Sequence, residues 1–471
     1  MNIINRSVVV LLAMLIVGTS VVIAGRGRKL PVDAYIKTAK IEIISGEEER
    51  YHTAIAMLDS LFIHYGHHAE GLYWMGKING DFIEKRASLK EKLPYLETMV
   101  AYIDSLHQCC ENQDIKKKYR KKCETFTSEM DSIKEFYWRN YYNAGVEQVT
   151  EVEELMETVQ QEEDSSSLAY YETRLEAQLD SCKDNMTLAI AIDPVDARPY
   201  IGLASAYEQA GDIETAVEWL IEALERAADR QELLSKIAYT YIGQNLYLEA
   251  IPFLKENIDI READEQAMTD TAYAARIAGT MYNLSVCYSN SEQYDSAFAM
   301  YQRILVLDPL NVSVISSTGR YYTMKARTAN DSASHYQSQG NEEQTTKWRE
   351  AKDAMFDSAR VFFKQAFELK QDNLLVCVEY GIVCALLLDN EGAAVAFTRA
   401  TELDPGDADN WTSLGDAHLN LKDFTKAAQA YEKTVELKPD NKPVWETLKA
   451  LYLELGNREK MAEADARIKS L

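Results

Sequence analysis

A three-residue string, Ile or Leu followed by any residue and then Pro, recurs along the chain at 192–194, 307–309, 403–405 and 437–439. The last two prolines are 34 residues apart, the gap from 309 to 405 is two such periods plus 28 residues, and the gap from 194 to 309 is three periods plus 13. A fixed period of this size indicates stacked supersecondary units, each of which packs only on its neighbours. The 471 residues therefore predict one repeat array, although length alone would suggest about two to four domains.

Seven repeats share one pattern of apolar and small residues, and they start at residues 197, 231, 278, 312, 374, 408 and 442. The eighth position is Gly, Ala or Ser in all but the last repeat. In six repeats an alanine opens the second half and a large apolar residue stands four positions later: Ala216 and Leu220, Ala250 and Leu254, Ala297 and Tyr301, Ala359 and Phe363, Ala393 and Phe397, Ala427 and Tyr431. Spacings of three, four and seven residues place one apolar stripe on each of two helices. The pattern predicts an all-α fold whose small residues let paired helices pack closely.

With these residues the chain resembles the tetratricopeptide repeat (TPR) family, strongly over 197–471 and more weakly over the divergent segment 35–196. The resemblance implies an α-α superhelix, or solenoid, of about ten helix-turn-helix repeats. The last repeat carries Lys449 in place of the small eighth residue and is truncated, as expected of a polar capping unit.

Three hairpins exceed the period, near 82–95, 136–192 and 325–352. The first helix of the second of these is expected to begin near Phe136. The third has a turn signal at Gly340 and Asn341, and its two arms would project about 21 Å beyond the neighbouring repeats. Such hairpins are either walls that contact a partner or insertions that a solenoid tolerates in its turns.

The N-terminal residues 1–24 include an uncharged apolar stretch, Ser7–Ala24, which a basic linker, 25–34, follows. This stretch fits a cleaved export signal and also reaches the length of an uncleaved membrane anchor. The basic residues after it leave an inward-facing orientation open as a third alternative. We expect an exported, envelope-located protein (periplasmic or extracytoplasmic), either anchored or secreted. The seven cysteines do not settle the compartment, because an odd number leaves at least one free thiol.

The charge is negative overall and unevenly placed. The chain has 50 Lys and Arg against 75 Asp and Glu, a net charge of −25, which argues against nucleic acid as a partner. A basic run at 116–122 nevertheless precedes an acidic stretch at 147–164. The basic run is either a docking site for anionic lipid near the N-terminal segment or a solvated helix face. Membrane association through 7–24 and 116–122 is therefore one expectation.

The sequence shows none of the common motifs of catalytic, nucleotide-binding or metal-binding sites. No nucleotide-binding glycine loop, zinc-protease, serine-hydrolase or calcium-loop motif occurs. His64, His67 and His68 cluster without a Cys or carboxylate at ligand spacing, and Cys377 and Cys384 occupy core positions of one repeat. We expect no catalytic residue, no cofactor and no metal, and hence a protein that is not an enzyme.

The TPR resemblance implies that positions two, five, six, nine, twelve and thirteen of each first helix line a concave groove. The candidate partner-binding residues at these positions are Lys236, Tyr239, Tyr282, Asn283, Asn290, Arg320, Val378, Ile382 and Ala385. The Lys and Asn clamp that holds a terminal carboxylate in some family members is not reproduced. The segment 374–388 is apolar on nearly all sides, which predicts either a covered groove or a hydrophobic ligand stripe.

Two functions remain. The first is a scaffold that binds a peptide or protein partner in the groove. The alternative is a structural subunit of an envelope complex that uses its convex face and protruding hairpins.

Overall fold

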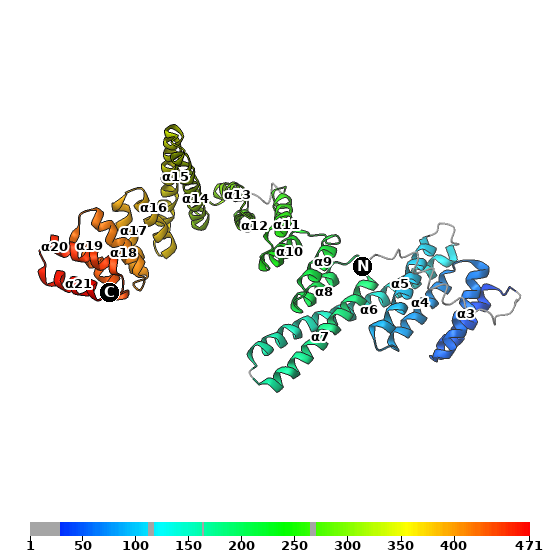
Figure 1. The fold of residues 1–471 in the computed structure, drawn as a ribbon. Helices are drawn as coiled ribbons and strands as arrows, with labels where there is room; N and C mark the ends of the chain where they lie inside the picture. The colour runs from blue at the N-terminus through cyan, green and yellow to red at the C-terminus, as the bar shows by residue number, and fades with distance from the viewer. Residues whose placement is uncertain (1–28, 112–116, 163, 264–269) are drawn as a thin grey trace. The chain divides into compact units, whose positions relative to one another are not determined.

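A computed structural model describes residues 29–111, 117–162, 164–263 and 270–471, and within these ranges it contains twenty helices and no strand. The chain divides into two compact units, with the boundary between Leu233 and Leu234. Figure 1 shows that each unit is a series of helical hairpins. The all-α repeat fold expected from the sequence is confirmed, with about ten helix pairs.

The helices of the first unit follow one another as α2 (Val32–Ile44), α3 (Glu48–Tyr65), α4 (Ala69–Glu84), α5 (Leu89–Glu111), α6 (Lys117–Gln161), α7 (Ser165–Ile192), α8 (Arg198–Gln209) and α9 (Ile213–Leu224). The second unit contains α10 (Gln231–Gly243), which begins just before the boundary, α11 (Tyr247–Glu262), α12 (Thr271–Asn290), α13 (Tyr294–Leu307), α14 (Val312–Ser338), α15 (Glu342–Leu369), α16 (Leu374–Leu386), α17 (Asn390–Leu403), α18 (Ala408–Asn420), α19 (Phe424–Leu437), α20 (Lys442–Glu454) and α21 (Arg458–Ser470).

Asp and Asn side chains start most helices of the second unit. From α14 to α21 every helix is preceded by an Asp or Asn whose side chain accepts a hydrogen bond from a backbone N–H of the first turn. Such a cap satisfies a donor that the helix itself leaves unpaired. The short polar strings between repeats therefore fix where each helix begins.

The core of each hairpin pairs a small residue with a large one. All six of the alanines that open second helices are buried, and so are the six large residues that follow them. A Cβ added at Gly381 would lie 2.8 Å from the ring of Phe397, and one added at Gly415 would lie 2.7 Å from Tyr431. These glycines let the second helix pack closely against the first, as the repeat pattern predicts.

The long hairpins differ in how closely they match the expectations. The turn expected at Gly340 and Asn341 lies between α14 and α15, where Gly340 has a positive φ of 71°. In the hairpin near 136–192, the expected start near Phe136 is wrong, because α6 runs unbroken from Lys117. The segment near 82–95 spans the end of α4, the turn after it and the start of α5, which contains Pro94.

Two helix starts also precede their expected positions. The linker 25–34 ends earlier than expected, because α2 begins at Val32, and α12 begins at Thr271, before the repeat start at 278. The apolar segment 1–24 lies outside the described residues. Among the described helices, none combines the length and the apolar character needed to cross a bilayer.

Candidate partner-binding surface

The candidate residues are distributed over four first helices of the second unit. Lys236 and Tyr239 lie on α10, Tyr282, Asn283 and Asn290 on α12, Arg320 on α14, and Val378, Ile382 and Ala385 on α16. We call these nine residues the groove set. The nine residues occupy equivalent positions of their repeats, so the fold repeats the same face from helix to helix.

The structure links the groove residues of α10 and α12 directly. The Asn283 side-chain amide donates a hydrogen bond to the Tyr239 hydroxyl at 3.2 Å. Tyr282 is half-buried and packs against the core beside them. The Asn290 amide bonds within its own helix instead, where it donates to the Val286 carbonyl at 2.9 Å.

An ion pair links α14 and α16 at the same two repeat positions, nine and six, that Tyr239 and Asn283 occupy in the earlier pair. Arg320 Nη1 lies 2.9 Å from Glu379 Oε1, and Arg320 Nη2 donates to the Ser317 hydroxyl at 2.7 Å. The Glu379 side chain is 13% exposed, and its second oxygen is buried with no hydrogen-bond partner among the described residues. Burial raises the pKa of Glu379, and the charge and hydrogen bond of Arg320 oppose that rise.

Sequence reasoning did not select Glu379. The signal was present, because Glu379 occupies position six of the repeat that starts at 374. What the sequence could not show is that Arg320 reaches it from the preceding repeat.

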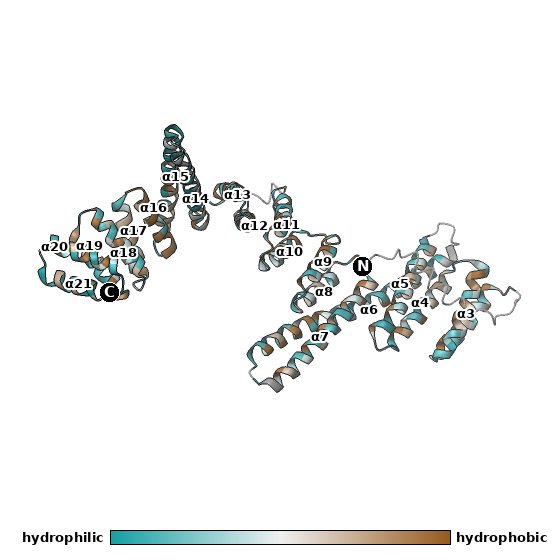
Figure 2. Cartoon of the chain, in the orientation of Figure 1, coloured by the Kyte–Doolittle hydropathy of each residue, from teal (hydrophilic) through white to brown (hydrophobic). Residues whose placement is uncertain are grey.

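The first helix of that repeat, α16, presents an apolar stripe to solvent. Ile382 is 45% exposed, Leu375, Ala385 and Leu386 are also exposed, and Val378 is half-buried. Figure 2 draws much of α16 in brown, the colour of hydrophobic residues. Of the two alternatives for segment 374–388, a covered groove does not fit the described residues, since the groove face of α16 stays accessible within them. Cys377 and Cys384 point the other way and are buried in the core, as expected.

The first unit has a hollow that the groove set does not include. It measures about 170 Å³ and is lined by Tyr142, Val146 and Val149 of α6, Met186 of α7, and Arg198, Ile201, Gly202 and Ser205 of α8. Met186 is fully buried, and a Cβ at Gly202 would clash with the Met186 methyl group. Ile201, Gly202 and Ser205 are positions five, six and nine of the repeat that starts at 197, so the family's groove positions would have predicted them.

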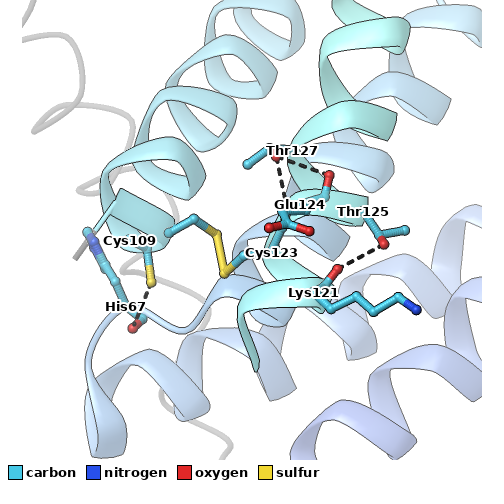
Figure 3. The surroundings of a disulfide bond; sticks show 8 residues. His67, Cys109, Lys121, Cys123, Glu124, Thr125 and Thr127 are labelled. Carbon is cyan, nitrogen blue, oxygen red and sulfur yellow. Dashed lines mark hydrogen bonds between the residues drawn. A yellow bond between two sulfur atoms is a disulfide. The ribbon is translucent and has the colours of Figure 1, made fainter. Parts of the chain in front are cut away.

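A disulfide bond joins the ends of α5 and α6. Cys110 and Cys123 are bonded, with their Cα atoms 5.6 Å apart. Figure 3 shows the neighbouring Cys109, whose thiol donates to the His67 carbonyl at 3.8 Å. Sequence reasoning did not pair these cysteines, because connectivity does not follow from spacing alone. Among the described residues, no group of three or more His, Cys, Asp or Glu side chains is placed to hold a metal ion.

Comparison with known proteins identifies the repeats. A family model described as tetratricopeptide repeat matches residues 387–442, and a second model of the same description matches 197–230 and 278–309. These segments cover well under half of the chain. No curated protein matches the chain significantly.

Solved structures of repeat proteins resemble the chain at low similarity. The C-terminal part of a TPR repeat-containing protein from Cytophaga hutchinsonii is 15% identical, with 57% of this chain and 93% of that chain covered and a TM-score of 0.40. YrrB, titled a TPR protein with an unusual peptide-binding site, is 18% identical, with 56% and 97% covered and a TM-score of 0.27. MamA is 19% identical, with 41% and 89% covered and a TM-score of 0.31. At such scores these structures say nothing about the partners of this chain.

The family-model matches, together with the helical hairpins that contain them, show that this chain carries tetratricopeptide repeats within an all-α repeat fold and support a role as a protein-interaction scaffold.

Proposed function

We propose that the chain is a non-enzymatic scaffold of the cell envelope, which binds an extended or helical segment of a protein partner along the concave face of its second unit. The observation that carries the proposal is the exposed apolar stripe of α16, with Ile382 at its middle. Burial of apolar surface drives most protein association, and an apolar patch with a polar rim is typical of an interaction site. The ion pair of Arg320 and Glu379 supplies such a rim on one side of the stripe.

Two features support an envelope location. The apolar stretch Ser7–Ala24 has the composition of an export signal or anchor. The disulfide between Cys110 and Cys123 is of a kind that persists in oxidising compartments and is rare in the cytosol. The four other cysteines that are buried, Cys182, Cys287, Cys377 and Cys384, need no oxidising surroundings because they pack as small apolar residues.

The test compares an aspartate on the stripe with an aspartate elsewhere. Ile382→Asp places a charge on the groove face of α16, and Val395→Asp places the same charge on α17, where Val395 is 58% exposed. Full-length protein and both variants are used to capture partners from detergent-solubilised membranes, and the captured proteins are identified by mass spectrometry. We expect Ile382→Asp to weaken capture of specific partners about tenfold or more, because loss of a central interface anchor costs about 2 kcal/mol or more. Val395→Asp should leave capture unchanged.

Equal capture by both variants would disprove the placement of the partner on α16. The alternative function, a structural subunit, is favoured by the length of α14 and α15, whose buried Ala326, Ala329 and Ala333 make the hairpin a packed element. Deletion of 325–352 distinguishes the two. Loss of association after this deletion, with Ile382→Asp having no effect, would support the structural subunit.

A further inference from the structure

At one edge of the first unit, the first described residues lie at the same end as the basic residues at the start of α6. We define this entry edge by Lys29, Leu30, Ile63, Tyr65, Arg120, Lys121 and Lys122. The helix α2 begins at this edge, α3 ends there, and α6 begins there. In the sequence these three points are far apart, so the fold alone brings them together.

Two tyrosines fix the beginning of the described chain at this edge. The Leu30 backbone N–H donates to the Tyr35 hydroxyl at 3.3 Å, and the Tyr65 hydroxyl donates to the Leu30 carbonyl at 2.8 Å. The Lys29 ammonium lies 4.1 Å from the centre of the Tyr65 ring. Leu30 is therefore attached to the end of α3.

A second set of contacts holds the start of α6 beside the turn that follows α3. The Cys109 thiol bonds to the His67 carbonyl in that turn, and the disulfide of Cys110 ties α5 to Cys123 of α6 (Figure 3). Lys122 Nζ lies 3.3 Å from Glu70 Oε2 at the start of α4. The basic residues of α6 are thereby held at the same edge as Tyr65.

The charges at this edge are mixed but lean toward basic. Burial raises the pKa of Glu70, but the hydrogen bonds and charges of Lys40 and Lys122 hold it below its usual value, so Glu70 is neutralised as an ion pair. Asp33 of α2 and Glu111 of α5 are exposed acidic groups at this end. Against them stand the exposed Arg120 and Lys121, and Arg26 and Arg28 precede Lys29 in the sequence.

Exposed apolar side chains accompany the basic ones. Ile63 is 70% exposed near the end of α3, and Leu30 and Tyr65 are each 40% exposed. Tyrosine and lysine, each with an apolar body and a polar tip, are suited to the boundary between lipid and water. The apolar stretch Ser7–Ala24 comes a few residues before Lys29 in the sequence, and Lys29 itself lies over the Tyr65 ring at this edge.

We propose that the entry edge lies against an anionic lipid surface, with Ile63, Leu30 and Tyr65 in the interfacial layer and Arg120 and Lys121 facing the lipid headgroups. This proposal rests on the envelope location proposed above, with residues 1–24 retained as an anchor. It goes further, because it assigns a membrane-facing side to the repeat body itself. Each basic residue close to an anionic bilayer strengthens the attraction between protein and membrane. The binding constant changes about fivefold per residue.

The experiment measures how fast a membrane-impermeant maleimide labels single introduced cysteines in the full chain. Ile63→Cys reports the entry edge. Ile44→Cys is the matched control, because Ile44 is 78% exposed at the far end of α2, about 20 Å along the helix from its start. Both are reconstituted in vesicles of phosphatidylcholine alone and of equal parts phosphatidylcholine and phosphatidylglycerol. The unsubstituted chain supplies the background from Cys109, and circular dichroism checks that each variant is folded.

In the mixed vesicles we expect Ile63→Cys to react at least about fivefold more slowly than Ile44→Cys. Adding Arg120→Glu and Lys121→Glu should restore the rate, and the protection should be weaker in phosphatidylcholine alone. Flotation of the vesicles separates the two proposals. If the chain fails to float with the vesicles, the anchor and the membrane-facing edge are both wrong. If it floats and Ile63→Cys reacts as fast as Ile44→Cys, or if charge reversal changes nothing, the entry-edge proposal alone is overturned.

Discussion

Glu379 places a carboxylate among the apolar groove residues of α16, where only one of its oxygens is paired. Arg320 approaches from α14 and satisfies Oε1, while Oε2 is buried without a partner among the described residues. A buried group left unpaired costs about 1–3 kcal/mol, and replacing it with a neutral group recovers part of that cost. A residue that costs stability and lies on a candidate binding surface is a candidate for contact with a partner.

Glu379→Gln should make the second unit more stable, by about 1 kcal/mol near pH 8. Because the folded-state pKa of Glu379 is raised above its ordinary value of 4.5, the folded protein holds this proton more tightly than the unfolded chain does. The free energy of unfolding of the natural chain therefore falls as pH rises from about 4.5 through the raised pKa, and then levels off. The variant lacks this decrease, so the difference between the two proteins should grow with pH.

Urea unfolding at several pH values measures this difference. The matched control is Glu446→Gln, which makes the same substitution at an exposed position of α20. A difference between Glu379→Gln and the natural chain that is constant or shrinks with rising pH would contradict the argument.

The turn inside each of the last seven hairpins keeps one backbone feature, although the residue that carries it varies. In each repeat from α8 to α21, the turn between the two helices contains one residue with positive φ: Gly211, Asn245, Glu292, Gly340, Leu388, Lys422 and Gly456. This is the left-handed conformation that ends many helices and that glycine adopts without strain. At Leu388 and Lys422 the side chain makes the same conformation costly.

Leu388→Gly should therefore stabilise the second unit, by about 0.5–1 kcal/mol. Leu388 is 77% exposed, so little packing is lost with its side chain. Gly211→Ala is the reciprocal variant in the first unit, where φ is 79° and the space around the glycine is open, so only backbone strain opposes the methyl group. Gly211→Ala should lower the free energy of unfolding of the first unit by a similar amount. Thermal and urea unfolding of both variants provide the measurement, and a destabilised Leu388→Gly protein would show that the side chain has a packing role.

On the scale of the whole molecule, the chain consists of two compact units whose repeats contact mainly their neighbours in sequence. In such an array a local change affects the stability of nearby repeats and fades along the chain. The disulfide of Cys110 and Cys123 belongs entirely to the first unit, whereas the groove set belongs entirely to the second. The two features are therefore open to separate tests.

Cys123→Ser should lower the stability of the first unit and leave the second unchanged. The bond closes a short loop, with a sequence separation of 13, for which the expected loss is about 3 kcal/mol. Hydrogen exchange followed by mass spectrometry resolves the two units in the full chain. Faster exchange in α4, α5 and α6 with unchanged exchange in α14–α21 is the expected result, and dithiothreitol should reproduce it in the natural chain. Uniformly faster exchange across both units would show that they unfold as one.

The sequence by itself determined the repeat, the helical hairpins and much of the core. Small and large residues recur at fixed positions because a helix pair can bury its stripe in only one register, and Asp or Asn caps mark where the helices begin. It did not determine where α6 begins, because a start was expected near Phe136 and no local signal there distinguishes one long helix from two shorter ones. The groove set follows from family positions, and whether those residues bind a partner stays a prediction.

Only the tertiary structure decided which distant residues meet. The sequence could not show that Arg320 reaches Glu379, that Met186 and Gly202 line one hollow, or that Cys110 bonds to Cys123. It also could not show that the basic residues of α6 lie at the edge where Leu30 begins the described chain. The periodicity of the sequence indicates which face of a helix is buried. Contacts between repeats depend on how each helix pair stacks on the next, and side-chain packing in three dimensions determines that stacking.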